Sequence, residues 1–267
     1  MAATGTAFLM YHELSLPGRS ACLPEPGYTR YVVSASNFAE QMKRIAREGW
    51  QGRNVSQALQ SFDGKSVCIT FDDGCETDLL SAAPVLRELG FGATSYITVN
   101  FLNKPGYMTD TQVRELHALG MEIGCHSLSH PYLTDLDDTQ LRDETAGAKE
   151  RLEQIAGVPV EHYSCPGGRW DARVANTVKQ AGFRSMATST TGLNTATTDL
   201  FALNRVAILD GISSDRVLRV CRGQAILLTQ LKEKTRAATR RILGNQGYDA
   251  IRSLILGGKH KSDSPAD

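Results

Sequence analysis

The segment Val67-Cys68-Ile69-Thr70-Phe71-Asp72-Asp73-Gly74 decides the fold of this chain. Its five β-favouring residues end at two adjacent carboxylates and a glycine, a pattern typical of a buried strand followed by a tight turn. An ordinary Asp-Gly turn is the simple interpretation. However, two neighbouring carboxylates repel each other beside an apolar core unless a cation or hydrogen-bond donors compensate them. The segment therefore indicates a strand that ends in a charged, functional turn.

Other apolar runs end in the same way. Residues 8–11 lead into His12, residues 121–125 lead into His126, and residues 163–165 lead into the turn at Pro166-Gly167-Gly168. Segments with helical spacing separate these runs, and such alternation predicts a parallel sheet, either open or closed into a barrel. We favour the barrel, because there the carboxyl ends of all strands converge on one face, whereas an open sheet gathers only the loops beside its switch point.

Length and composition suggest how the chain is organised into regions, but they do not identify its chemistry. Of the 267 residues, 29 are basic and 29 acidic, so no overall charge attracts nucleic acid or anionic lipid. We expect a barrel over residues 1–212, a basic helical extension over 213–256 and a disordered tail over 257–267. The extension is rich in arginine and lysine between Arg216 and Arg241. A solvated helix face explains these charges most simply, and binding of an acidic glycan or peripheral contact with a membrane surface are the alternatives. Nucleic acid is the least supported partner, because no aromatic residues interleave with the charges.

Cysteine usage and the termini suggest a compartment. None of the six cysteines forms a C-x-x-C pair, and Cys68 and Cys125 lie inside apolar runs, so we expect reduced thiols. The first residues show no secretory signal, and no stretch approaches the ~20 apolar residues that span a bilayer. These features favour a cytoplasmic protein, with membrane association as the further hypothesis.

His126 and His130 form the second half of the candidate site. The i, i+4 spacing predicts that both imidazoles lie on one face of a helical turn that Pro131 ends. A lone histidine is more often an ordinary hydrogen-bonded group than a ligand. Together with Asp73, however, the pair makes a His₂-carboxylate set that leaves one coordination position open for water, as a catalytic zinc site requires. Asp72 then remains as a general base.

With these two motifs the sequence resembles the NodB-type polysaccharide deacetylases of carbohydrate esterase family four. The resemblance covers roughly residues 8–209 and is carried by residues 70–74 and 126–131, with support from Gly49-Trp50, residues 84–86 and residues 121–124. It implies a deformed (β/α) barrel of about seven parallel strands that removes N-acetyl groups from amino sugars. It also implies one divalent ion held by Asp73, His126 and His130, with Asp72 as the base. Zn²⁺ is the favoured metal, and Co²⁺, Ni²⁺ and Mn²⁺ are the alternatives.

Two departures from the family pattern concern catalysis. In this family the segments at residues 70–74 and 126–131 correspond to the first two motifs, and the third motif usually begins with an arginine that orients the base. In this chain Ser164 stands at that position. The following turn can still offer the Gly167 N–H to a developing oxyanion. Arg205 and Arg169 are the candidates for the orienting arginine, and Arg205 is favoured because it starts an apolar strand.

The second departure concerns the general acid. No late Leu-Leu-His segment is present, since Thr229 follows residues 225–228. The strand ending at His12 resembles that of rearranged, exopolysaccharide-associated members, in which the corresponding strand comes first in the chain. We therefore assign His12 as the general acid, with a structural hydrogen bond as the alternative role.

These inferences favour a metal-dependent hydrolase that deacetylates N-acetylhexosamine units of a polysaccharide or its precursor in exopolysaccharide or envelope synthesis. One alternative keeps the site but hydrolyses another amide. The other is a glycan-binding protein without activity, which the serine at the start of the third motif suggests. The expected partner in each case is an N-acetylated glycan or a related amide, and the sequence does not fix an oligomeric state.

Overall fold

The computed structural model describes residues 5–62, 65–224 and 226. Its central strand is β5 (Ser66–Phe71), which is buried at every position. β5 pairs in parallel with β1 (Thr6–Tyr11) along one edge. Its other edge is shared, because β4 (Gln51–Arg53) pairs with the first half and β6 (Thr94–Ile97) with the second. Burial on both faces explains the continuous apolar run in this segment.

Parallel pairing continues outward from β5 in both directions. On one side follow β7 (Glu122–Cys125), β8 (His162–Ser164) and β9 (Ser185–Ala187), and on the other side β11 (Val206–Ala207) pairs with β1. The order β11-β1-β5-β6-β7-β8-β9 contains seven parallel strands, which confirms the deformed (β/α) barrel. The segment before β11 also bonds to the far edge, since the Leu203 N–H donates to the Met186 carbonyl.

Three short strands complete the described sheets. β10 (Leu193–Asn194) pairs antiparallel with β1, and β2 (Glu13–Ser15) pairs in parallel with β3 (Val32–Ser34) in a separate two-stranded sheet.

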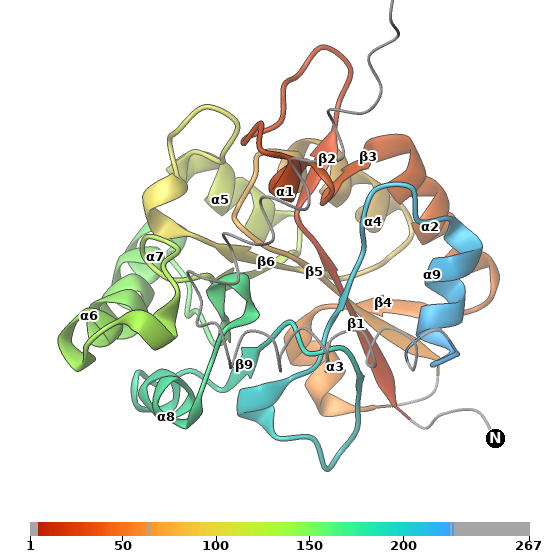
Figure 1. Cartoon of the computed structure of the whole chain (residues 1–267). Coiled ribbons are helices and arrows are strands. Elements are labelled where there is room, and N and C mark those ends of the chain that lie inside the picture. Colours follow the sequence, from red (N-terminus) through yellow and green to blue (C-terminus); the bar gives the residue numbers. More distant parts are fainter. Residues whose placement is uncertain (1–4, 63–64, 225, 227–267) are drawn as a thin grey trace, which may run out of the picture.

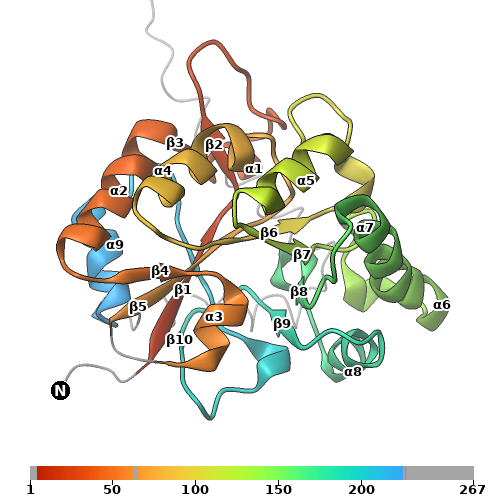
Figure 2. The ribbon, with the colours of Figure 1, turned by 180° about the vertical axis from the view of Figure 1, so that it is seen from behind.

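Helices lie around the outside of the strands (Figures 1 and 2). They are α1 (Pro26–Thr29), α2 (Ala35–Arg47), α3 (Val55–Gln60), α4 (Ala83–Glu88), α5 (Asp110–Ala118), α6 (Asp138–Arg142), α7 (Ala148–Ala156), α8 (Ala172–Gln180) and α9 (Ser214–Cys221). Short π-helical segments, Asp78–Ala82 and Asp143–Gly147, precede α4 and α7. The buried apolar residues of α2 and of α4 to α9 belong to one large core that also includes strand residues. Val55 and Ala58 of α3 instead belong to a second, smaller cluster with Phe8, Cys68 and Tyr96.

The C-terminal part of the described chain packs on this barrel. α9 lies beside α2 (Figure 1), and Val217 and Leu218 on α9 are buried. The side chain of Gln41 on α2 donates to the Ile212 carbonyl just before α9. Most of the predicted basic extension and the whole predicted tail lie outside the described residues. In the described part of the chain, no helix has the length and apolar character to cross a membrane.

Candidate functional site

Asp72 and Arg205 form a buried bidentate ion pair at the end of β5. Arg205 Nη1 lies 2.7 Å from Asp72 Oδ1, and Nη2 lies 2.8 Å from Oδ2. Nη2 also donates to the Ser164 hydroxyl at 2.8 Å, and Nε donates to the Thr188 carbonyl. Both members of the pair are almost fully buried. The carboxylate of Asp72 is therefore held in one orientation by a guanidinium that comes from the segment before β11, not from the third motif.

Asp73 lies beside this pair in a strained backbone conformation. Its φ is 81°, in the left-handed region that residues other than glycine rarely adopt. In this conformation the side chain points toward the two histidines: Asp73 Oδ1 lies 3.6 Å from His126 Nε2 and 3.5 Å from His130 Nε2. Three potential ligand atoms, one from each residue, lie within 4.8 Å of one another.

The two histidines do not lie on a helical turn, so that part of the sequence prediction is wrong. Ser127 and His130 have φ values of 68° and 66°, and the segment is a loop. The His130 N–H donates to the Ser127 hydroxyl at 2.9 Å, which holds the loop in its curve. The i, i+4 spacing brings the imidazoles together through this local turn instead of through helical periodicity.

The hydrogen bonds of His126 determine which nitrogen faces Asp73. Its Nδ1 lies 2.9 Å from the Ser164 carbonyl oxygen, an acceptor only, so Nδ1 carries the proton and Nε2 presents a lone pair. That lone pair faces Asp73 Oδ1, which is buried and has no hydrogen-bond partner among the described residues. Two acceptors that face each other in a buried site require a cation or a proton between them. The donor set thus fits a divalent metal ion with three protein ligands.

Glu144 supports the histidine loop (residues 126–131), and the sequence did not predict this role. Its Oε2 accepts hydrogen bonds from the backbone N–H groups of Leu128 and Ser129, both at 2.8 Å, and its Oε1 accepts from the Ser129 hydroxyl. Because Glu144 lies in the π-helical segment before α7, no local pattern in residues 126–131 could have identified it.

Electrostatics separate the two adjacent aspartates. Burial favours the neutral form of Asp72, but Arg205 and His126 outweigh burial and hold the pKa of Asp72 well below its ordinary value. Burial raises the pKa of Asp73 to about 6, with His12 opposing and Asp72 adding to the rise. Burial lowers the pKa of His126 to about 3, so this imidazole is neutral near pH 7. Asp72 is consequently ionised and paired, while Asp73 lacks a compensating charge of comparable strength.

His12 follows β1 and Gly167 follows β8, two strands that are not adjacent in the sheet. The Asp72 N–H donates to the Tyr11 carbonyl at 3.0 Å, which places His12 beside the aspartates. Burial lowers the pKa of His12, and the charges of Asp73 and Asp72 oppose that shift in part. The imidazole packs against Tyr31 with a centroid distance of 4.5 Å, and its Nδ1 is buried without a partner among the described residues. Gly167 is exposed in the turn after β8 with φ 60°, where a Cβ would lie 2.9 Å from the Tyr132 ring.

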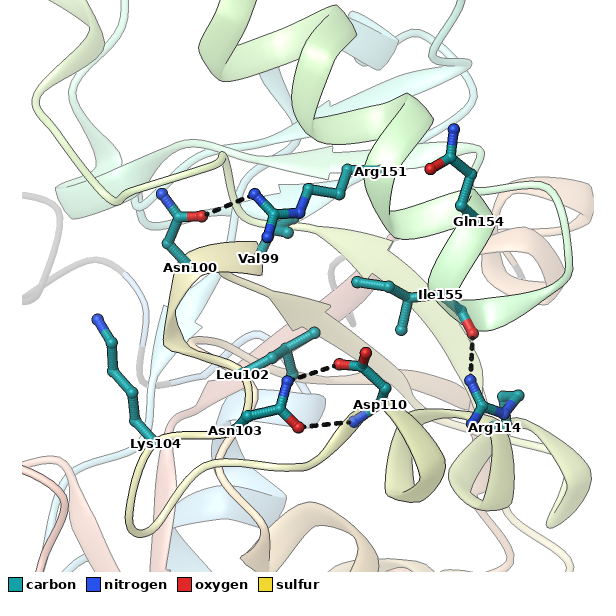
Figure 3. Close-up of a pocket in the computed structure, with 10 residues that line it drawn as sticks. All are labelled: Val99, Asn100, Leu102, Asn103, Lys104, Asp110, Arg114, Arg151, Gln154 and Ile155. Atoms are coloured by element: carbon teal, nitrogen blue, oxygen red, sulfur yellow. Dashed lines mark hydrogen bonds between the residues drawn. The ribbon is translucent and has the colours of Figure 1, made fainter.

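A hollow of about 630 Å³ is lined by the segment after β6 and by residues of α5 and α7 (Figure 3). Its polar lining includes Arg114 and Arg151, and it adjoins the loop because the Asn100 N–H donates to the Leu128 carbonyl at 2.8 Å. None of the Asp73 cluster lines this hollow. The candidate chemistry is therefore located by ligand geometry and charge, not by the shape of a cavity.

Comparison with known proteins shows similarity to polysaccharide deacetylases. Residues 59–186 match the sequence profile of the family described as polysaccharide deacetylase. The chain is 26% identical over 211 residues to the putative polysaccharide deacetylase YxkH of Bacillus subtilis, covering 77% of this chain and 72% of that protein. It is 30% identical over 126 residues to a chitooligosaccharide deacetylase of Azorhizobium caulinodans, covering 46% of this chain but only 58% of that enzyme.

A solved structure shows the same fold. The crystal structure of a polysaccharide deacetylase from Bacillus cereus has a TM-score of 0.72 to this chain at 24% identity, covering 81% of this chain and 69% of the other.

Proposed function

Because the chain carries a domain of the polysaccharide deacetylase family over residues 59–186, we propose that it hydrolyses N-acetyl groups on N-acetylhexosamine units of a polysaccharide or its precursor. The proposal includes one divalent ion, Zn²⁺ in preference to Co²⁺, Ni²⁺ or Mn²⁺, and a role in exopolysaccharide or envelope synthesis. The observation that supports it most is the buried, unpartnered Asp73 Oδ1 facing two imidazole nitrogens, beside a second aspartate that Arg205 keeps ionised.

In this proposal Asp73, His126 and His130 hold the ion. When bound, the ion supplies Lewis-acid polarisation of the acetamide carbonyl and of water. The neutral state of His126 near pH 7 leaves its Nε2 lone pair available for coordination. Glu144 limits the movement of the loop that carries both imidazoles, and such supporting groups maintain ligand geometry.

The remaining residues move protons and stabilise charge. Asp72 accepts a proton from the attacking water, and Arg205 keeps the Asp72 carboxylate oriented without donating a proton itself. The Gly167 N–H donates to the developing oxyanion. His12 protonates the departing amine. Burial lowers the pKa of His12, and the negative charge of Asp73 and Asp72 opposes that shift and so favours the protonated form that this step needs.

Acetate release from chito-oligosaccharides tests the proposal. We expect release that a chelator abolishes and that added Zn²⁺ restores, and we expect Asp73→Ala and His130→Ala to lose bound metal and activity together. His117→Ala is the matched control, because His117 lies on α5 and bonds to the Met121 carbonyl, away from the cluster. Full metal-dependent turnover by either ligand variant would contradict the assignment.

Acetate release, measured beside cyclic-amide hydrolysis and glycan binding, separates the alternatives. Hydrolysis of a cyclic amide without acetate release would favour the hydrolase of another amide. Glycan binding without any hydrolysis would favour the inactive protein. The structure weakens the motive for an inactive protein, because Arg205 pairs with Asp72 although Ser164 occupies the start of the third motif.

A further inference from the structure

Two cysteines lie side by side immediately behind the Asp72-Asp73 turn. Cys75 follows that turn by two residues and is fully buried, and Cys22 lies in the loop between β2 and α1 and is half-buried. Their Sγ atoms are 3.5 Å apart. The proposed deacetylation uses neither thiol.

The surroundings of Cys22 favour a reactive thiolate. Arg19 Nη2 lies 3.5 Å from Cys22 Sγ and donates to the Gly106 carbonyl at 2.7 Å, so the guanidinium is fixed next to the sulfur. An adjacent cation stabilises a thiolate and increases its nucleophilicity at neutral pH. The hydrogen bonds from Cys75 and Arg19 lower the pKa of Cys22, although burial and the negative charge of Glu13 oppose them.

A metal ion is a poorer occupant of this cluster than a sulfur–sulfur bond. Glu13 also lies within ligand distance of both cysteines. Its carboxylate, however, already pairs with Arg19 and accepts the Cys22 N–H. The fixed guanidinium compensates the negative charge there and would repel a second cation.

We propose that Cys22 and Cys75 are an oxidisable pair that forms a reversible disulfide with a small-molecule disulfide as oxidant. The Cys22 thiolate attacks one sulfur of glutathione disulfide, which breaks that S–S bond and releases one glutathione thiolate. Cys75 then attacks the Cys22 sulfur, forms the Cys22–Cys75 bond and releases the second glutathione. Two protein thiols are oxidised, one glutathione disulfide is reduced to two thiols, and the two protons pass to the released glutathiones.

The bond would tie the β2–α1 loop to the turn that carries Asp73. The two cysteines are 53 residues apart in sequence, so the cross-link closes a long loop of the unfolded chain. We expect oxidation to raise the melting temperature of the full chain by roughly 5–10 °C, measured with chelator present.

Thiol counting and peptide mapping test the proposal. The reduced full chain is equilibrated over a series of glutathione ratios, quenched with acid, denatured and titrated for thiols. We expect the count to fall from the six cysteines of the sequence to four. Trypsin alone should release residues 20–30 linked to residues 66–87, which contain both Cys68 and Cys75. Additional cleavage before Asp72 separates those two cysteines and should leave the link on Cys75.

Variants sharpen the result. Cys75→Ser should stop the reaction at a glutathione adduct on Cys22, and Arg19→Gln should slow the first exchange step. Cys68→Ala is the matched control and should still form the disulfide. Six free thiols at every ratio, a link to Cys68, or a zinc ion that is lost only in Cys22→Ser and Cys75→Ser would overturn the proposal.

Discussion

Removing the Arg205 guanidinium is the sharpest perturbation of the site. Arg205→Met retains much of the side-chain volume but leaves the Asp72 carboxylate buried, uncompensated and without the two short hydrogen bonds that the guanidinium donates to it. Deleting one partner of a buried ion pair costs about 3–5 kcal/mol of folding free energy. With a urea dependence of about 2–3 kcal/mol per molar, the unfolding midpoint should fall by roughly 1–2 M.

The loss should depend on pH in a defined direction. The pKa of Asp72 is lower in the folded protein than in the unfolded chain, so the ionised carboxylate contributes stability above the unfolded pKa of about 3.9. That contribution disappears as the pH falls through the folded value. The unfolded pKa is the same in both proteins, so the deficit of Arg205→Met should be largest near pH 7 and should shrink once the pH falls below the raised pKa of the uncompensated Asp72 carboxylate in the variant.

Urea denaturation of four proteins measures the coupling: the parent chain, Arg205→Met, Asp72→Asn and the double variant, all with chelator so that metal binding does not contribute. The double variant should recover most of the loss, because it removes the buried charge as well as its partner. Arg184→Met is the matched control, since Arg184 pairs with Glu161 at an exposed position and should cost no more than about 1 kcal/mol. A single Arg205→Met variant as stable as the parent at pH 7, or no recovery in the double variant, would refute the reasoning.

Three further outcomes are expected. Glu144→Gln should weaken zinc binding about 10–100-fold in a competition titration, because it removes the charge that holds the histidine loop; unchanged affinity would show that the loop is rigid without it. His12→Ala should retain zinc but reduce kcat about 100-fold or more, because in the proposed mechanism His12 protonates the departing amine. An unchanged kcat would indicate that His12 has only a structural role. His162, buried against Ser56 and Ser185, has a pKa lowered by burial, so its neutral form stabilises the fold above pH ~6.5 and loses that effect as the pH falls. His162→Gln should therefore flatten the decline of the unfolding free energy in acid, and equal slopes in both proteins would contradict this.

Strand ends made much of the site predictable from sequence. Each apolar run could be interpreted as a strand, and parallel strands place their carboxyl ends together, so Asp72, Asp73 and His126 were expected to meet. The conformation of the loop after β7 could not be predicted in this way. A spacing of four residues suits a helix, but here left-handed backbone at Ser127 and His130 produces the same proximity. Periodicity cannot distinguish these two local solutions.

Supporting groups from distant elements were beyond local patterns. Glu144 bonds to backbone N–H groups, which every residue except proline carries, so the sequence of residues 126–131 contains no mark of that partner. The proximity of Cys22 and Cys75 depends on how the β2–α1 loop folds back, and irregular loops have no periodic signal.

Arg205 shows why a departure from a motif need not mean a lost function. The requirement at Asp72 is physical: a buried carboxylate needs a fixed positive charge and two donors in its plane. Any element that reaches this point can meet it, and the segment before β11 does so because it crosses between β9 and β1. Ser164 fits this arrangement, since its small side chain leaves room for the guanidinium and its hydroxyl accepts a hydrogen bond from Nη2 at 2.8 Å. The serine and Arg205 therefore form one solution to the charge of Asp72, distributed over two separate segments of the chain.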